Sequence, residues 1–305
     1  MLKNEALQRK AKIFRELHFG ETLLILPNIW DPLGAALLEE LGYPAIATAS
    51  ASIAYTHGMP DGENIRFSEL INILAKIVLS VNIPVTADIE SGYANNRAEL
   101  QENIRLIVQS GVVGINIEDY DLIHRKLFPV DVHCKRLKIV RETAEAMGVS
   151  LFINARTDVF VKGTEWKTSE AKWEEAVKRG KAYLEAGADG FYPIMLSDKK
   201  EITTLVAEIP GPVNILAGPG IPDIKALKEI GVARLSLGPG FLKTAIRAMK
   251  QSALQLKDGE GLSAVTDNEI SSDYLKKLVT HSWYVLATRF AVSEDCGVIY
   301  CSGGN

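Results

Sequence analysis

Cysteine is scarce in this chain, with three among 305 residues, at Cys134, Cys296 and Cys301. Three cysteines are too few for a disulfide framework, so we expect a reducing compartment, the cytoplasm. Cys296 and Cys301 are close enough in sequence to pair, but their place in a C-terminal tail favours free thiols. Stability is therefore expected from a hydrophobic core, which a chain of this length can bury without cross-links.

Long apolar runs and blocks of basic residues are also lacking. No apolar stretch approaches the ~20 residues of a membrane span. The N-terminus carries Glu5 and Glu16 among its basic residues and lacks the apolar segment of a signal peptide. The net charge is -4 without a basic block, which argues against nucleic acid as the main partner. The sequence therefore predicts a protein whose partners are neither membranes nor nucleic acids.

The chain does have a regular alternation of short strands and helices. Segments rich in β-branched residues are predicted as strands at 23–26, 45–48, 83–88, 114–118, 151–156, 190–194, 213–216 and 233–237. Segments with helical periodicity separate them, and such alternation implies a parallel sheet. Since eight strands close a barrel, the predicted fold is α/β, a TIM-type (β/α)8 barrel. We predict a catalytic barrel over residues 1–255 and a helical extension with a tail over 256–305.

Charged residues lie at the ends of three successive predicted strands. Asp88 and Glu90 close the third strand, Glu118 the fourth and Arg156 the fifth. The C-terminal ends of parallel strands are where β/α proteins place their catalytic groups. Asp88 and Glu90 are two residues apart, so in extended backbone they face the same side. Oxygen ligands without His or Cys suit a hard ion such as Mg²⁺ or Mn²⁺. The alternative is a solvated loop that happens to be acidic.

Several motifs resemble the isocitrate lyase/phosphoenolpyruvate mutase superfamily, in the order and spacing of that family. They are Pro27-Asn28-Ile29-Trp30-Asp31, Ala47-Thr48-Ala49-Ser50-Ala51, Gly58-Met59-Pro60-Asp61-Gly62, Thr86-Ala87-Asp88-Ile89-Glu90-Ser91-Gly92-Tyr93, Asn116-Ile117-Glu118-Asp119, Asn154-Ala155-Arg156-Thr157-Asp158, Asn214-Ile215-Leu216-Ala217-Gly218 and Arg234-Leu235-Ser236-Leu237-Gly238. The resemblance covers about residues 23–245. It implies a TIM-type barrel, often tetrameric, that binds a 2-oxocarboxylate on Mg²⁺ and exchanges its last helix between subunits.

The resemblance also implies roles for individual residues. Asp88, Glu90 and Glu118 resemble the residues that hold the metal, mostly through water. Asp61 resembles the acidic residue on the loop after the second strand. The backbone N–H groups of Ser50 and Ala51 resemble the pocket for the substrate carboxylate, and Arg156 its positive partner, a task that suits a planar guanidinium. Trp30 is predicted to line this pocket, unless it is a purely structural aromatic, and Asn214 is predicted to bind substrate.

The chain departs from the family pattern at two places. The second residue of the usual aspartate pair is Glu90, whose longer side chain is compatible with a bridging water. The loop after the fourth strand lacks the Lys-x-Cys-Gly-His motif of isocitrate and methylisocitrate lyases, because Val130 and Val132 occupy the lysine and cysteine positions. His133 and Cys134 are out of register and are expected at the start of a helix, where Cys134 is structural or incidental.

These observations favour a Mg²⁺-dependent lyase or hydrolase that cleaves a C–C bond in a small 2-oxo or 2-hydroxy carboxylic acid, such as oxaloacetate or methylisocitrate. One alternative is a mutase or hydrolase of C–P bonds acting on phosphonopyruvate, against which the missing loop lysine counts. The other is a barrel that binds 2-oxo acids without turnover.

The sequence also predicts an oligomer. A helix over Asp267–Ala291 carries more apolar residues than an isolated surface helix should expose. A homo-oligomer is therefore expected, as a tetramer of paired dimers or a dimer.

Overall fold

The computed structural model describes residues 2–267 and 269–280. It has eleven strands and twelve labelled helices within that part of the chain, and residues 272–280 are helical as well. The strands are β1 (Leu24–Leu26), β2 (Asn28–Ile29), β3 (Ile46–Thr48), β4 (Val85–Asp88), β5 (Gly114–Glu118), β6 (Tyr120–Asp121), β7 (Lys126–Leu127), β8 (Phe152–Thr157), β9 (Gly190–Pro193), β10 (Asn214–Leu216) and β11 (Arg234–Ser236). The helices are α1 (Leu2–His18), α2 (Pro32–Glu40), α3 (Ser50–Thr56), α4 (Phe67–Leu79), α5 (Arg97–Gln109), α6 (Val130–Ala146), α7 (Val159–Lys162), α8 (Ser169–Glu185), α9 (Lys199–Glu208), α10 (Ile224–Ile230), α11 (Gly240–Lys257) and α12 (Ser263–Thr266).

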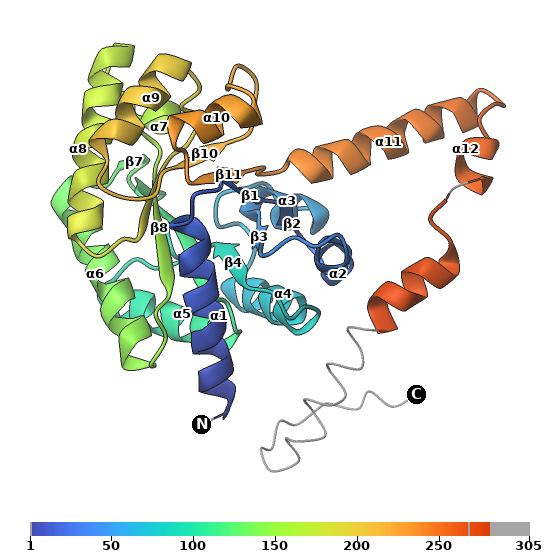
Figure 1. The fold of residues 1–305 in the computed structure, drawn as a ribbon, viewed down its shortest axis with the longest axis horizontal. Coiled ribbons are helices and arrows are strands. Elements are labelled where there is room, and N and C mark those ends of the chain that lie inside the picture. The colour runs from blue at the N-terminus through green and yellow to red at the C-terminus, as the bar shows by residue number, and fades with distance from the viewer. Residues whose placement is uncertain (1, 268, 281–305) are drawn as a thin grey trace.

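The parallel strands close into a barrel, which confirms the predicted fold class. One run of neighbours is β2-β3-β4-β5-β8-β9, and the other is β1-β11-β10. A bridge between Phe191 and Val213 joins the two runs on one side. On the other side β1 and β2 are successive parts of one strand, interrupted at Pro27, which has no N–H to donate. Helices surround this sheet in Figure 1.

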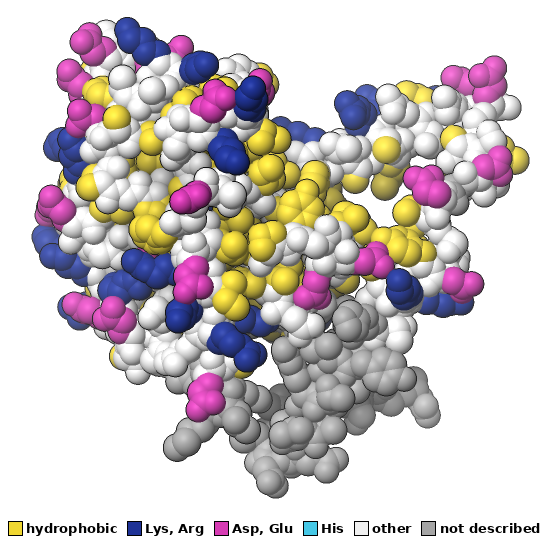
Figure 2. All heavy atoms as spheres, viewed as in Figure 1, with side chains coloured by type: hydrophobic (Ala, Val, Ile, Leu, Met, Phe, Trp, Pro, Cys, Tyr) yellow, Lys and Arg dark blue, Asp and Glu magenta, His cyan; other side chains and the backbone are white. Residues whose placement is uncertain are grey.

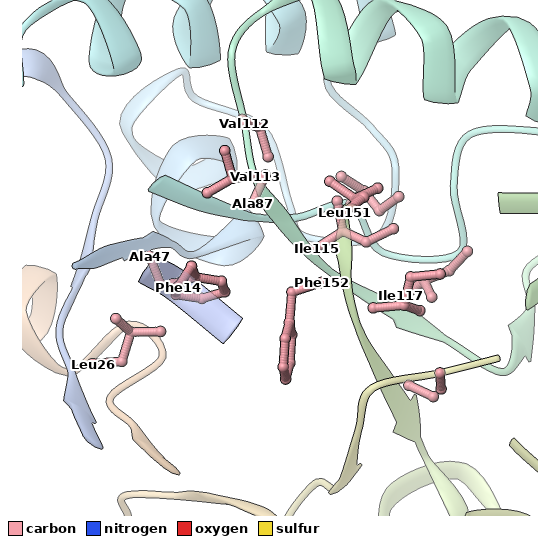
Figure 3. Close-up of a cluster of buried hydrophobic side chains, with 14 of the residues drawn as sticks. Phe14, Leu26, Ala47, Ala87, Val112, Val113, Ile115, Ile117, Leu151 and Phe152 are labelled. Carbon is pink, nitrogen blue, oxygen red and sulfur yellow. The ribbon is translucent and has the colours of Figure 1, made fainter. Parts of the chain in front are cut away.

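Helix α1 closes the N-terminal end of the barrel. Phe14 packs edge-on against Phe152 with a ring centroid separation of 5.5 Å, and His18 stacks on the same ring at 3.9 Å. Gly114 makes room for Phe14, because a Cβ there would lie 2.5 Å from the Phe14 ring. Figure 3 shows Phe14 and Phe152 among the buried side chains of the strands. With one end packed in this way, the C-terminal strand ends remain for a site.

Helix α11 does not complete the ring of helices around the barrel. It projects away from the barrel (Figure 1), and of its residues only Leu242 is buried. Leu242, Ile246, Met249 and Leu256 fall on one face of the helix by their spacing. That face therefore has little cover from its own chain, as the yellow patches on the projecting arm in Figure 2 show.

The C-terminal extension is described only in part. Residues 272–280 are helical, and the rest of the predicted helix, with Cys296 and Cys301, lies outside the described residues. This segment contacts helix α2 of the same chain, since the Tyr274 hydroxyl donates to Glu40 Oε2 at 2.6 Å. The predicted boundary at residue 255 falls inside α11, and the division into two parts stays a proposal. Within the described ranges, no helix combines the length and apolar character needed to cross a membrane.

Candidate functional site

The ends of β4, β5 and β8 place the predicted charged residues together. Arg156 and Glu118 are register partners on adjacent strands. Arg156 Nη2 lies 2.9 Å from Glu118 Oε2, and Arg156 Nη1 lies 3.9 Å from Asp88 Oδ2. Both Glu118 and the guanidinium are largely buried, with the Arg156 side chain 12% exposed. The site is therefore a cluster of charges at the C-terminal end of the barrel.

The guanidinium of Arg156 is held in one orientation by Asp158. Arg156 Nε donates to Asp158 Oδ1 at 2.7 Å, and Nη2 donates to Asp158 Oδ2 at 3.0 Å. Nη2 also contacts Glu118. The two N–H groups of Nη1 have only the longer contact to Asp88, so they are the donors of this guanidinium with the weakest contacts. Arg156 therefore keeps one edge available for an anion.

Lys162 is a second cation at the site, which sequence reasoning missed. Its Nζ lies 3.2 Å from Glu118 Oε1 and 3.1 Å from Asp158 Oδ2, and 3.9 Å from the centre of the Tyr120 ring. The lysine ends α7, a one-turn helix that follows the Arg156 motif. The spacing of Asp158 and Lys162, four residues apart, was the signal available in the sequence.

Glu90 does not lie in extended backbone, so the expectation that it faces the same side as Asp88 through strand geometry was wrong. β4 ends at Asp88, and Glu90 has a φ of 51° in the turn that follows. Its carboxylate accepts hydrogen bonds from the Glu63 N–H at 2.6 Å and from the Tyr93 hydroxyl at 3.0 Å. The Glu90 N–H in turn donates to Asp88 Oδ1 at 3.3 Å. The turn, rather than the strand pleat, brings the two carboxylates together.

The carboxylates perturb one another because they are buried side by side. Burial and the charges of Asp61, Asp88 and Glu118 raise the pKa of Glu90 to about 8. Burial and the charges of Asp158 and Asp88 raise the pKa of Glu118 to about 7, although Arg156 opposes the shift. Burial also raises the pKa of Asp88. Such crowding of like charges is what a divalent cation would relieve.

Three more of the predicted site residues are Asp61, Ser50 and Ala51. Asp61 is exposed, and its charge contributes to the raised pKa of both Asp88 and Glu90. The Ser50 hydroxyl donates to Asp88 Oδ2 at 3.2 Å. Ser50 begins α3 and Ala51 follows, so their N–H groups belong to a first turn that lacks intrahelical partners.

Trp30 and Asn214 are the other two residues that were predicted to contact the substrate. Trp30 is half-buried and packs against the hydrophobic core. Asn214 is buried inside the barrel, where its Oδ1 accepts a hydrogen bond from the Ser236 hydroxyl at 3.1 Å.

The predicted metal ligands do not form a direct three-ligand cluster. No group of three or more His, Cys, Asp or Glu side chains among residues 2–267 and 269–280 has the geometry to hold a metal ion. Glu90 is committed to Glu63 and Tyr93, and Glu118 to Arg156 and Lys162. Any ion here would be coordinated by few protein oxygens and several waters, which is the usual coordination of Mg²⁺ in proteins.

The segment after β5 forms a hairpin and then a helix. β6 and β7 pair antiparallel, with Tyr120 opposite Leu127. α6 then begins at Val130 and includes His133 and Cys134, as expected. His133 is fully buried between the rings of Phe128 and Tyr183. The Cys134 thiol is half-buried against the carbonyl of Ala182, and burial raises its pKa. Neither residue is placed to act on a ligand bound at the strand ends.

Asp119 anchors the base of this hairpin. Its Oδ2 accepts hydrogen bonds from Thr157 Oγ1 and the Tyr183 hydroxyl, both at 2.7 Å, and from Arg179 Nη1 at 2.9 Å. Its Oδ1 accepts from the Asp158 N–H at 2.9 Å. Asp119 thus fixes Asp158, which in turn orients Arg156.

Comparisons with known proteins agree with this arrangement. Residues 14–257 match the phosphoenolpyruvate phosphomutase family. An uncharacterised protein of Mycobacterium tuberculosis is 33% identical over 251 residues, covering 82% of this chain and 90% of that protein. An oxaloacetate decarboxylase of Pseudomonas fluorescens is 26% identical, covering 93% of this chain and 94% of that protein. A crystal structure of a Burkholderia cenocepacia protein superposes with a TM-score of 0.76 at 36% identity, covering 83% of this chain and 99% of that one. The chain belongs to the phosphoenolpyruvate phosphomutase family and is an enzyme of the isocitrate lyase/phosphoenolpyruvate mutase superfamily.

Proposed function

We propose that the protein is a Mg²⁺-dependent enzyme that cleaves a C–C bond in a small 2-oxo or 2-hydroxy carboxylic acid. The observation that supports this proposal is the cluster of Asp88, Glu90, Glu118 and Arg156 at the C-terminal end of the barrel. Relatives of this chain are named oxaloacetate decarboxylase and 2-methylisocitrate lyase. A cytoplasmic location, expected from the low cysteine content, remains part of the proposal.

The donor set suits Mg²⁺ bound mainly through water. Of the three predicted ligands, Asp88, Glu90 and Glu118, Asp88 has the longest contacts to other protein groups, at 3.2 to 3.9 Å. It would therefore contact the ion or its waters. Glu90 and Glu118 would accept hydrogen bonds from the waters coordinated to the ion, and their negative charges would balance the charge of the ion. Bound Mg²⁺ would act as a Lewis acid toward the 2-oxo group and the enolate that develops when the bond breaks.

The chain's own residues would bind and orient the acid. Arg156 Nη1 and the backbone N–H groups of Ser50 and Ala51 would hold the substrate carboxylate. Trp30 would line the pocket, and Asn214 would contact the distal part of the substrate from inside the barrel. Asp61, the exposed carboxylate of the set, can exchange a proton with solvent and is the residue proposed to handle the proton at the reacting carbon.

Cleavage of a C–P bond is the second candidate, because one relative, 27% identical over 254 residues, is named phosphonopyruvate hydrolase. The loop position of the expected lysine is Val130, which begins α6, so a lysine would have to come from elsewhere. A panel of oxaloacetate, methylisocitrate and phosphonopyruvate, assayed for pyruvate, oxalate and phosphate release, separates the two reactions. Tight oxalate binding without turnover of any 2-oxo acid would instead favour a non-catalytic barrel.

Replacing Asp88 by Ala should weaken Mg²⁺-dependent binding of oxalate, an enolate mimic, by at least about tenfold, since outer-shell partners alone contribute that much. Isothermal titration calorimetry with and without Mg²⁺ measures the effect. Asp131→Ala is the matched control, because Asp131 is a surface carboxylate paired with Lys135 on α6. Equal oxalate affinity in wild type and Asp88→Ala would contradict the assignment of the site.

A homo-oligomer is also part of the proposal. Ile246 and Met249 of α11 are 51% and 66% exposed, which is unusual for large apolar side chains on one helical face. A groove of about 440 Å³ lies between this helix and the end of α3, lined by Tyr55, Leu242 and Ile246 among others. We expect a second copy of the chain to cover this face, and the exchanged element predicted from the resemblance would then include α11.

The double variant Ile246→Glu/Met249→Glu should break the assembly, because two carboxylates would be desolvated at the interface. Multi-angle light scattering at micromolar concentration measures the change in mass. Gln251→Glu is the control, since it adds a charge to the same helix without removing an apolar side chain. A wild-type protein that is already monomeric under these conditions would refute the proposed oligomer.

A further inference from the structure

The loop that carries Asp61 has little apolar contact with the rest of the barrel. It runs from the end of α3 at Thr56 to the start of α4 at Phe67. Of the described residues 57–66, only Ile65 is buried, and Asp61 itself is exposed. The position of Asp61 over the charged cluster therefore depends on polar contacts of this loop.

Glu63 supplies such contacts through both its backbone and its side chain. Its N–H donates to Glu90 Oε2 at 2.6 Å. Its Oε1 accepts hydrogen bonds from the Ser91 hydroxyl at 2.7 Å and from the Tyr93 N–H at 2.8 Å. All three partners belong to the turn at residues 90–93 that follows β4. One half-buried residue thus joins the loop to the turn that carries Glu90.

Asn64 extends this connection back to Asp61. Its Nδ2 donates to the carbonyl of Asp61 at 3.1 Å and to the carbonyl of Gly62 at 3.2 Å. These bonds hold the backbone between Asp61 and Asn64 as one short unit. A displacement of Glu63 would therefore displace Asp61 as well.

The turn after β4 is held in place by groups outside the loop. The buried Arg136 of α6 donates from Nη1 to the Ala94 carbonyl at 3.3 Å and from Nη2 to the Ser91 carbonyl at 2.5 Å. Asn103 of α5 donates from Nδ2 to the Tyr93 carbonyl at 2.7 Å. The turn is therefore the fixed side of the contact, and the loop is the side whose position depends on it.

Backbone strain is concentrated at this contact. Five non-glycine residues in the described part of the chain have a positive φ, and three of them are Glu63 at 55°, Glu90 at 51° and Tyr93 at 53°. This left-handed conformation is unfavourable for a residue with a Cβ atom. It persists where the surrounding contacts enforce it, and such residues gather at functional sites. The strain therefore points to a function for the contact between loop and turn.

We propose that Glu63 is a positioning residue, which holds Asp61 where it can handle the proton at the reacting carbon. This inference rests on the proposed function, in which Asp61 has that task. Glu63 does not touch the substrate and acts through Asp61. Its carboxylate is required as the acceptor for Ser91 and Tyr93.

Proton exchange of pyruvate, a small 2-oxo acid, can test this role without knowledge of the natural substrate. In deuterated water with Mg²⁺, the Asp61 carboxylate would remove a proton from the methyl group, exchange it with solvent and return a deuteron to the same carbon. Proton NMR measures the loss of the methyl signal. Glu63→Ala should slow this exchange by about 100-fold, as a displacement of about 1 Å can. The affinity for oxalate with Mg²⁺, measured by calorimetry, should change by less than about threefold, because Asp88 and Arg156 keep their contacts.

Further variants separate positioning from a purely structural role. Glu63→Gln keeps an Oε1 acceptor, so its exchange rate should stay within about threefold of wild type. Asp61→Asn should be at least as slow as Glu63→Ala, and Asp61→Asn/Glu63→Ala should be no slower than Asp61→Asn alone, because the two residues act as one unit. A further loss in the double variant would contradict action through Asp61. Glu102→Ala is the matched control, since Glu102 is an exposed carboxylate paired with Arg105 on α5.

Hydrogen–deuterium exchange of the backbone, read by mass spectrometry, tests the contact itself. In Glu63→Ala the amides of residues 57–64 should exchange at least about tenfold faster than in wild type, whereas those of α4 should not change. Equal protection of residues 57–64 in both proteins would show that Glu63 does not hold the loop. Ser91→Ala, which removes one of the two donors to Glu63 Oε1, should slow pyruvate exchange by about tenfold and serves as the test if Glu63→Ala does not fold.

The outcomes distinguish this inference from the proposed function. If Glu63→Ala exchanges pyruvate protons as fast as wild type, the role of Glu63 is refuted and the proposed function stands. If wild type binds oxalate with Mg²⁺ but exchanges no pyruvate protons, the task of Asp61 is refuted, and the role of Glu63 with it. If wild type does neither, the proposed function itself is refuted together with both roles.

Discussion

Replacing Arg156 by Lys should lower kcat/KM by about 10³-fold with whichever 2-oxo acid proves to be the substrate, as expected when a buried charge pair is broken. Arg156 performs two tasks with one planar group. Nε and Nη2 bind Asp158 and Glu118, and Nη1 remains for the substrate. A lysine has a single nitrogen, so it cannot bind both carboxylates and also present a donor pair to the substrate. Steady-state kinetics and oxalate calorimetry on the same protein measure the effect.

Lys162→Met is the matched control for this prediction. Lys162 contacts Glu118 and Asp158, the same two carboxylates, but from the other side. Its loss removes one positive charge and leaves the Arg156 fork, so we expect a loss of about tenfold or less in kcat/KM, the cost of a partly exposed ion pair. Similar losses in both variants would mean that neutralising the carboxylates, rather than the geometry of Arg156, is what the site requires.

The sequence was informative wherever a local pattern determines the position of a residue. Asp88, Glu118 and Arg156 follow apolar runs of strand length, and parallel strands in a closed barrel must bring their ends to one rim. The start of a helix near His133 was likewise visible in the sequence, and α6 begins at Val130, three residues before His133.

Contacts set by a turn or by distant packing were not predictable in this way. Glu90 has a left-handed backbone conformation in a turn, so the two-residue period of a strand gave the wrong geometry for it. Lys162 reaches the site from a one-turn helix, which is too short for a hydrophobic periodicity, so its spacing of four residues from Asp158 was the signal for its position. The sequence did not predict that α11 projects from the barrel. An amphipathic helix has the same sequence pattern whether its apolar face is covered by its own chain or by another subunit.

The buried network around Asp119 joins residues far apart in the chain, and it leads to the second large effect. Arg179 is separated from Asp119 by 60 positions, and its guanidinium also donates to the Phe128 carbonyl at 3.0 Å. The Arg179 side chain is 4% exposed and the Asp119 side chain is fully buried. Removing Asp119 takes away one of two carboxylates that surround this buried guanidinium and leaves Glu175, whose Oε1 accepts a hydrogen bond from Arg179 Nε at 2.9 Å.

Asp119→Ala should therefore reduce the free energy of unfolding by about 3–5 kcal/mol, measured by urea denaturation. The surface pair Lys181–Glu208 gives the control, since both side chains are nearly half exposed and Lys181→Ala should cost less than about 1 kcal/mol. The variant Asp119→Asn keeps one acceptor oxygen in place and removes the negative charge, so it should retain part of the stability that Asp119→Ala loses. If Asp119→Asn is instead as destabilised as Asp119→Ala, the loss comes from the missing charge beside Arg179, and the hydrogen bonds from Thr157, Tyr183 and the Asp158 backbone contribute little to it.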